Sequence, residues 1–182
     1  MLQITAAQVI VLLMFILLRE QGRLLLCACG QFQIWTSDTC SANSSQQLLD
    51  PYSFTHVLHG VLFFLLITLA FRRMAPGWQL LLALFLEAVW EVFENTSFVI
   101  ERYRTATAAL GYQGDTVVNS FGDLACAMAG FLVARHLGVW RSLMLFLFVE
   151  LILIVWIRDS LLLEILMLVR PVEAIKLWQA CG

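Results

Sequence analysis

Apolar residues run along this chain in five long stretches, each long enough to cross a bilayer as a helix. The stretches cover residues 4–20, 53–71, 78–100, 115–137 and 141–157. A polar segment at 28–52 is rich in Ser, Gln, Asn and Thr and lacks helical periodicity, which predicts an extramembrane loop. The pattern predicts one transmembrane domain of the all-α class, a polytopic transmembrane helical bundle of about five spans.

The last segment, residues 160–180, has a different pattern. It is apolar in part, but Arg170 and Pro171 interrupt it. The uninterrupted pieces are too short to cross a bilayer. This favours an amphipathic tail that forms an interfacial or re-entrant C-terminal helix.

Three glutamates interrupt the third apolar stretch at helical spacing. Glu87, Glu91 and Glu94 stand at i, i+4 and i+7, so a helix places them in one stripe. An ionisable side chain at the bilayer centre costs about 2.5–3.5 kcal/mol on insertion scales. The stripe is therefore expected to face a polar interior or water, and not lipid.

A second polar stripe begins the fourth stretch, where Asp115, Asn119 and Asp123 again follow helical spacing. His56 and His59 share one face at the start of the second stretch. A short turn joins the second and third stretches, so the end of the third lies at the same bilayer face as the start of the second. The polar residues expected to converge at this level are His56, His59, Glu91, Glu94, Asn95, Asp115, Asn119 and Asp123.

These residues leave three functions open. In the first, the polar pocket binds an envelope lipid, a lipid-linked molecule or another small amphiphilic ligand. Arg102, Arg104 or Arg158 would then hold an anionic head group, while the carboxylates take a cation or a proton. Membrane lipids would be the partners of such a protein.

The second function is a membrane-embedded enzyme, metal-assisted or acid/base, acting on such a ligand. A divalent metal such as Zn, Mn or Fe suits a mixed set of imidazoles and carboxylates and would activate water. The candidate ligands are His56, His59, Glu91, Asp115 and Asp123. The third function is a membrane assembly or scaffold protein whose polar groups satisfy one another.

Composition and charge narrow the class of protein. Hydrophobic residues make up 61% of the 182 residues and charged residues only 13%, which is typical of an integral membrane protein. The net charge is −2 and the basic residues form no patch, which excludes nucleic-acid binding. Two short turns hold the basic residues that favour the cytoplasmic side, Arg72, Arg73, Arg135 and Arg141, so the polar face is expected to be periplasmic.

The cysteines suggest a disulfide in the polar loop. Cys27 and Cys29 are separated by one residue, too close for a relaxed disulfide with each other. Either is expected to pair with Cys40 if the loop lies outside the cytoplasm.

Several segments, in order, resemble a known family. They are CACG followed by a tryptophan, YSFTHVLHG, EAVWEVFEN with VIERYR, GDTVVNSFGD, and WIRD with PVEAIKLWQ. On these motifs nearly the whole chain resembles an uncharacterised family of proteobacterial multi-pass inner-membrane proteins, catalogued as a domain of unknown function. The resemblance implies a location in the bacterial inner (plasma) membrane. A more distant resemblance to VanZ-like membrane proteins rests on Asp115, Asn119 and Gly122 with His56 or His59, and implies shared architecture.

Overall fold

Helices account for the regular structure of the chain. The computed structural model describes residues 1–37, 39, 44–107 and 111–180, and these residues form eight helices and no strand. In chain order they are α1 (Leu2–Glu20), α2 (Ser53–Ala70), α3 (Pro76–Glu94), α4 (Ser97–Ala106), α5 (Val117–Leu137), α6 (Val139–Ile157), α7 (Leu161–Val169) and α8 (Glu173–Gln179). The predicted all-α class is confirmed.

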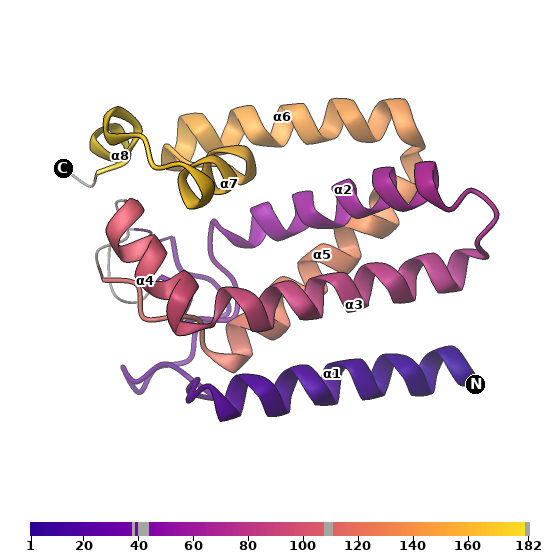
Figure 1. The fold of residues 1–182 in the computed structure, drawn as a ribbon, viewed down its shortest axis with the longest axis horizontal. Helices are drawn as coiled ribbons and strands as arrows, with labels where there is room; N and C mark the ends of the chain where they lie inside the picture. The colour runs from indigo at the N-terminus through magenta and orange to yellow at the C-terminus, as the bar shows by residue number, and fades with distance from the viewer. Residues whose placement is uncertain (38, 40–43, 108–110, 181–182) are drawn as a thin grey trace.

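Five of these helices, α1, α2, α3, α5 and α6, are 18 to 21 residues long and apolar enough to cross a membrane. α1 packs beside α3, α3 beside α2 and α2 beside α6, while α5 crosses them obliquely against α2 and α3 (Figure 1). The long helices leave many large apolar side chains exposed, such as Leu66, Phe148 and Val155. Apolar side chains on the outside of a bundle fit a lipid environment, and the chain has the construction of a multi-pass membrane protein.

The contact between α2 and α5 is the most extensive in the bundle. It depends on two glycines that let the backbones approach closely. A Cβ on Gly60 would overlap the carbonyl oxygen of Ala127, and a Cβ on Gly130 would overlap that of Val57. Small residues at such crossings are typical of membrane helices, because close packing replaces the hydrophobic effect as the source of attraction. This contact fixes the position of α2, which carries His56 and His59, against α5, which carries Asn119 and Asp123.

The short helices gather at one end of the bundle. In Figure 1, α4, α7 and α8 lie at the same end as the polar loop, opposite the N-terminus and the turn between α2 and α3. α7 and α8 occupy the predicted amphipathic tail and are separated at Arg170 and Pro171. α7 leaves Leu162, Leu166 and Val169 exposed, so this end also presents apolar surface.

The third apolar stretch, predicted at 78–100, is two helices in the structure. α3 ends at Glu94, and Asn95 closes it with a backbone bond to Glu91 O. Thr96 then caps α4 by accepting a bond from Val99 N. The chain turns here because both residues use their side chains at the break, Asn95 toward the start of α5 and Thr96 as an N-cap.

The expectation for the cysteines is wrong in one respect. Cys27 and Cys29 form a disulfide with each other, with their Cα atoms 5.1 Å apart. A turn, in which Gly30 N bonds to Cys27 O and Gly30 has a φ of 73°, brings the two side chains together. Spacing along the sequence does not show this turn. The expected partner, Cys40, lies outside the described residues.

Candidate functional site

Two histidines of α2 meet one glutamate of α3 near the polar end of the bundle. His56 Nδ1 lies 2.6 Å from Glu87 Oε1, and His59 Nδ1 lies 3.1 Å from Glu87 Oε2. The pair stands one helical turn apart, so both rings face the same neighbour. Glu87 is fully buried and the histidines nearly so. Trp90 packs edge to face against His59, with ring centroids 5.4 Å apart.

Glu91, one turn further along α3, adds a second carboxylate to this group. Its Oε1 lies 3.3 Å from His56 Nδ1, and its side chain is fully buried. Neither carboxylate oxygen has a hydrogen-bond partner in the described part of the chain. From α5, Asp123 Oδ2 lies 3.9 Å from His56 Nε2, while Asp123 Oδ1 accepts a 2.7 Å bond from Ser53 Oγ.

A second polar group ties the end of α3 to the start of α5. Asn95 Nδ2 donates to Asp115 Oδ2 at 2.7 Å, and Asp115 N donates to Asn95 Oδ1 at 2.7 Å. Tyr112 donates its hydroxyl to Asp115 Oδ1 at 2.9 Å. These bonds satisfy a buried carboxyl group with neutral donors. Asn119 is also buried, but its side-chain amide has no partner among the described residues.

A cavity of about 430 Å³ borders these two groups. The bundle contributes one side of its wall and the short helices the other. Its volume falls in the range of small-molecule sites. The ionisable lining residues described by the structure, apart from tyrosines, are His56, His59, Glu94, Asp115, Asp123, Asp159, Glu164, Glu173 and Lys176. Six carboxyl groups thus face one lysine.

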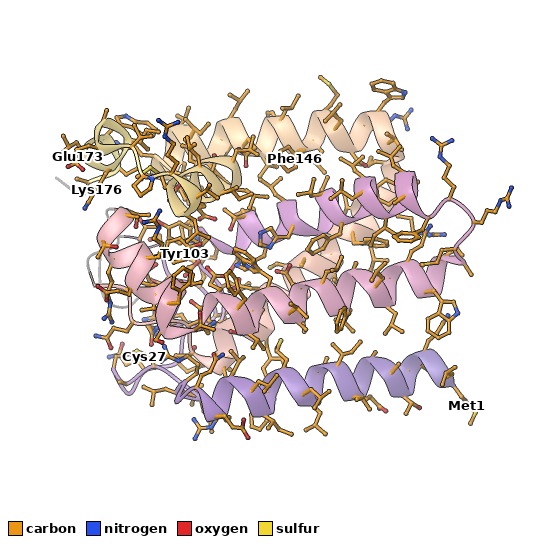
Figure 2. The ribbon with its side chains drawn as sticks, viewed as in Figure 1. Met1, Cys27, Tyr103, Phe146, Glu173 and Lys176 are labelled. Atoms are coloured by element: carbon orange, nitrogen blue, oxygen red, sulfur yellow. A yellow bond between two sulfur atoms is a disulfide. The ribbon has the colours of Figure 1, made fainter. Side chains whose placement is uncertain are left out.

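The short helices cover the cavity from the polar end. α4 contributes Tyr103 and α8 contributes Glu173 and Lys176, which Figure 2 shows together at this end, while Phe146 of α6 lies well inside the bundle. Lys176 Nζ donates to Thr105 O at 2.7 Å, which links α8 to α4. The cover also has an apolar part, since the exposed side chain of Leu177 lines the same cavity.

Burial raises the pKa of two carboxyl groups in this cover, those of Asp159 and Glu164. The pKa of Asp159, just beyond α6, rises to about 7, mainly through desolvation and further through the charge of Glu150. Desolvation, with repulsion from Asp159 and Glu94, also raises the pKa of Glu164 well above its usual value. The cover therefore carries less negative charge near neutral pH than its composition implies.

The three arginines predicted to hold an anionic head group do not line the cavity. Arg102 donates to the carbonyls of Leu168 and Val169 at the end of α7. Arg104 donates to Tyr112 O and Arg158 to Trp178 O. In these positions the arginines link the segments at the polar end to one another, because the last carbonyls of a helix and the loop carbonyls need hydrogen-bond donors.

The sequence predictions place the other candidates near one another but miss part of the site. The structure brings His56, His59, Glu91, Glu94, Asn95, Asp115, Asn119 and Asp123 to one end of the bundle. Glu87 was not among the predicted site residues, although its place in the glutamate stripe was the available signal. The cover residues, such as Tyr103, Glu164 and Lys176, carry no local signal.

Comparison with known proteins gives a family for most of the chain. The family model described as "Protein of unknown function (DUF2585)" matches residues 18–181. A UPF0314 protein of Sphingopyxis alaskensis is 41% identical over 98% of this chain and 95% of its own length. UPF0314 proteins of Novosphingobium aromaticivorans and Paracoccus denitrificans are 42% and 41% identical, over 92% and 87% of this chain and 87% and 82% of their own lengths. No solved structure matches the chain.

Proposed function

Since this chain belongs to the DUF2585 family of proteins of unknown function, we propose from its cavity that it binds a small amphiphilic ligand through a hydrogen-bond-donating or cationic head group. The observation that carries the proposal is the imbalance in the lining, where six carboxyl groups face one lysine. Carboxyl groups accept hydrogen bonds and attract cations, so amines and clustered hydroxyls suit this wall. An envelope lipid or lipid-linked molecule with such a head group fits these terms.

The apolar part of the cover supports an amphiphile over a fully polar solute. Ile157 and Leu177 line the cavity beside the acids, and Leu177 is 69% exposed. α7 continues this apolar surface through Leu162 and Leu166. A head group among the carboxyls would therefore lie next to a surface on which its tail can rest.

We place the protein in the bacterial inner membrane, with the polar end on the periplasmic side. Helical spans favour the inner membrane, because proteins that span the bacterial outer membrane are typically β-barrels. Arg72 and Arg73, in the turn between α2 and α3, lie at the opposite end of the bundle from the cavity, and short basic loops stay in the cytoplasm. The disulfide between Cys27 and Cys29 belongs to the polar end and suits an oxidising compartment.

The test is identification of the amphiphiles that co-purify with the full chain. The protein is extracted from its own membrane into polymer nanodiscs, and the bound lipids are measured by mass spectrometry beside the lipids of the whole membrane. Wild type is compared with the double variant Glu94→Gln, Glu164→Gln. The matched control is Glu101→Gln, an exposed residue of α4 outside the cavity.

We expect a species with an amine or polyhydroxyl head group to be enriched in wild type and in the control. The double variant should retain about tenfold less of it, because glutamine cannot ionise to pair with a cationic amine, and a hydrogen bond to a charged group is worth about 1.5–3 kcal/mol. A lipid profile in wild type equal to that of the whole membrane contradicts the proposal. Enrichment of a purely anionic head group contradicts the assignment of the head-group chemistry.

A further inference from the structure

We infer that His56, His59, Glu87 and Glu91 form a binding site for one divalent transition metal at the wall of the cavity. The site goes beyond amphiphile binding, because it needs no amphiphile to be occupied. Two imidazole nitrogens and two carboxylates are a donor set that zinc, manganese and iron accept. The four residues come from only two helices, α2 and α3, which pack directly against each other.

Two pairs of donor atoms have the separations of atoms that share one metal. Ligands held at about 2.1 Å from a metal lie about 3.0–3.4 Å from each other in octahedral or tetrahedral geometry. His59 Nδ1 is 3.1 Å from Glu87 Oε2, and His56 Nδ1 is 3.3 Å from Glu91 Oε1. The 2.6 Å contact between His56 Nδ1 and Glu87 Oε1 has to open by about 0.5 Å on the same geometric basis. His56 is shared by two clusters of donor atoms, one with His59 and Glu87 and one with Glu91 and Glu94, so the Glu91 side chain has to shift toward the first cluster to share its ion.

Glu91 supplies the observation that hydrogen bonding alone leaves unexplained. Its side chain is 0% exposed, and both carboxylate oxygens lack hydrogen-bond partners among the described residues. A buried carboxylate without donors is strongly unfavourable, and a neutral carboxyl group would still present an unpaired O–H. Its Oε1 points at the His56 nitrogen that already contacts Glu87. A divalent cation between them would partner Glu91 and balance the charges of both glutamates.

Asp123 completes the arrangement from α5. Histidines that bind a metal through one nitrogen usually donate the other N–H to a carboxylate, which orients the ring. His56 Nε2 faces Asp123 Oδ2 at 3.9 Å, and Ser53 Oγ holds Asp123 from its other oxygen. Asp123 thus acts as a positioning residue, and Glu94, which lies within 4.8 Å of the donor atoms of His56 and Glu91, stands beside the open side of the site.

The experiment measures metal in the full chain purified in detergent. The protein is stripped with a chelator and then titrated with Co²⁺ or Zn²⁺, with the metal content read by elemental mass spectrometry and the Co²⁺ site by its visible absorption. The variants are Glu91→Gln and His59→Ala. The control is Glu150→Gln, another buried glutamate, which lies on α6 and outside the cluster.

Wild type and Glu150→Gln are expected to bind one metal per chain, with an absorption spectrum of mixed nitrogen and oxygen ligands. Affinity should fall by about 100-fold or more in Glu91→Gln and His59→Ala, at or beyond the upper end of the loss seen for second-shell changes. Stripped wild type that takes up no metal overturns the inference, as does full uptake by both variants.

Two further readings keep the result independent of variant folding and of the proposed ligand. If a variant unfolds, the Co²⁺ spectrum of wild type alone decides, because ligation by surface carboxylates lacks the signature of imidazole nitrogens. Lipid analysis of the same samples separates the two proposals. Metal without an enriched amphiphile contradicts the proposed function only, and an enriched amphiphile without metal contradicts the metal site only.

Discussion

Replacing Asn95 by alanine tests whether its pair with Asp115 joins the end of α3 to the start of α5. Asn95 is 1% exposed, and its side chain makes three hydrogen bonds, to Glu91 O, to Asp115 Oδ2 and from Asp115 N. Alanine removes all three and leaves the amide and one carboxylate oxygen of Asp115 buried without these partners. Each unsatisfied group costs about 1–3 kcal/mol, so the variant should lose about 2–6 kcal/mol of stability.

The assay is thermal unfolding in detergent followed by tryptophan fluorescence. For a chain of this length, 1 kcal/mol corresponds to about 2–4 °C, so Asn95→Ala should lower Tm by about 4 °C or more. Gln113→Ala is the control, because Gln113 loses the same kind of side chain from an exposed position nearby. A change in Tm of less than about 2 °C in Asn95→Ala, on the same scale, would refute the view that this pair joins α3 to α5.

Two other predictions concern the bundle and its cover. Gly60→Ala should destabilise the protein by about 1–3 kcal/mol, because the added Cβ would overlap the α5 backbone. Gly77→Ala should be nearly neutral in the same unfolding assay, because its Cβ would meet only the flexible side chain of Gln3. Equal Tm values for the two variants would contradict this. Asp159 has a pKa of about 7 in the folded chain and 3.8 in the unfolded chain, so the folded chain binds more protons between these pH values. The stability that this group contributes is therefore fully present below about pH 4 and is lost as the pH rises through 7. Tm measured from pH 5 to pH 8 should therefore fall less steeply in Asp159→Asn than in wild type, and identical slopes would argue against the burial of this carboxyl.

Periodicity and connectivity predict much of the site. The spacing of Glu87, Glu91 and Glu94 indicates one face of a helix, and the insertion cost of carboxylates excludes the lipid side. The short turn between α2 and α3 then places His56 and His59 opposite that face. These steps need only helix geometry and the bilayer thickness, so the sequence alone is enough to make them.

Other parts of the site depend on rotamers and on distant segments, which periodicity does not encode. Glu87 is the glutamate that both histidines contact, because α2 and α3 pack at a particular height. Lys176 enters the cavity from α8 through the fold of the last segment. Arg102 was expected at a ligand because of its charge, yet nearby carbonyls of α7 supply its partners. The break after Glu94 had a local signal, since Asn95 and Thr96 are residues that end and start helices.

Burying Glu87 and Glu91 costs free energy, so the presence of these residues calls for a functional explanation. Both are 0% exposed, and two ionisable groups at bilayer depth cost about 5–7 kcal/mol on insertion scales. Polar contacts between membrane helices return about 0.6 kcal/mol each, so the contacts of Glu87 with two histidines and of Glu91 with His56 offset only a small part. A scaffold built from α2, α3 and α5 would be more stable with apolar residues at these two positions. The glutamates are therefore better explained by something that they bind, and the inferred cation beside the wall of the cavity meets that requirement.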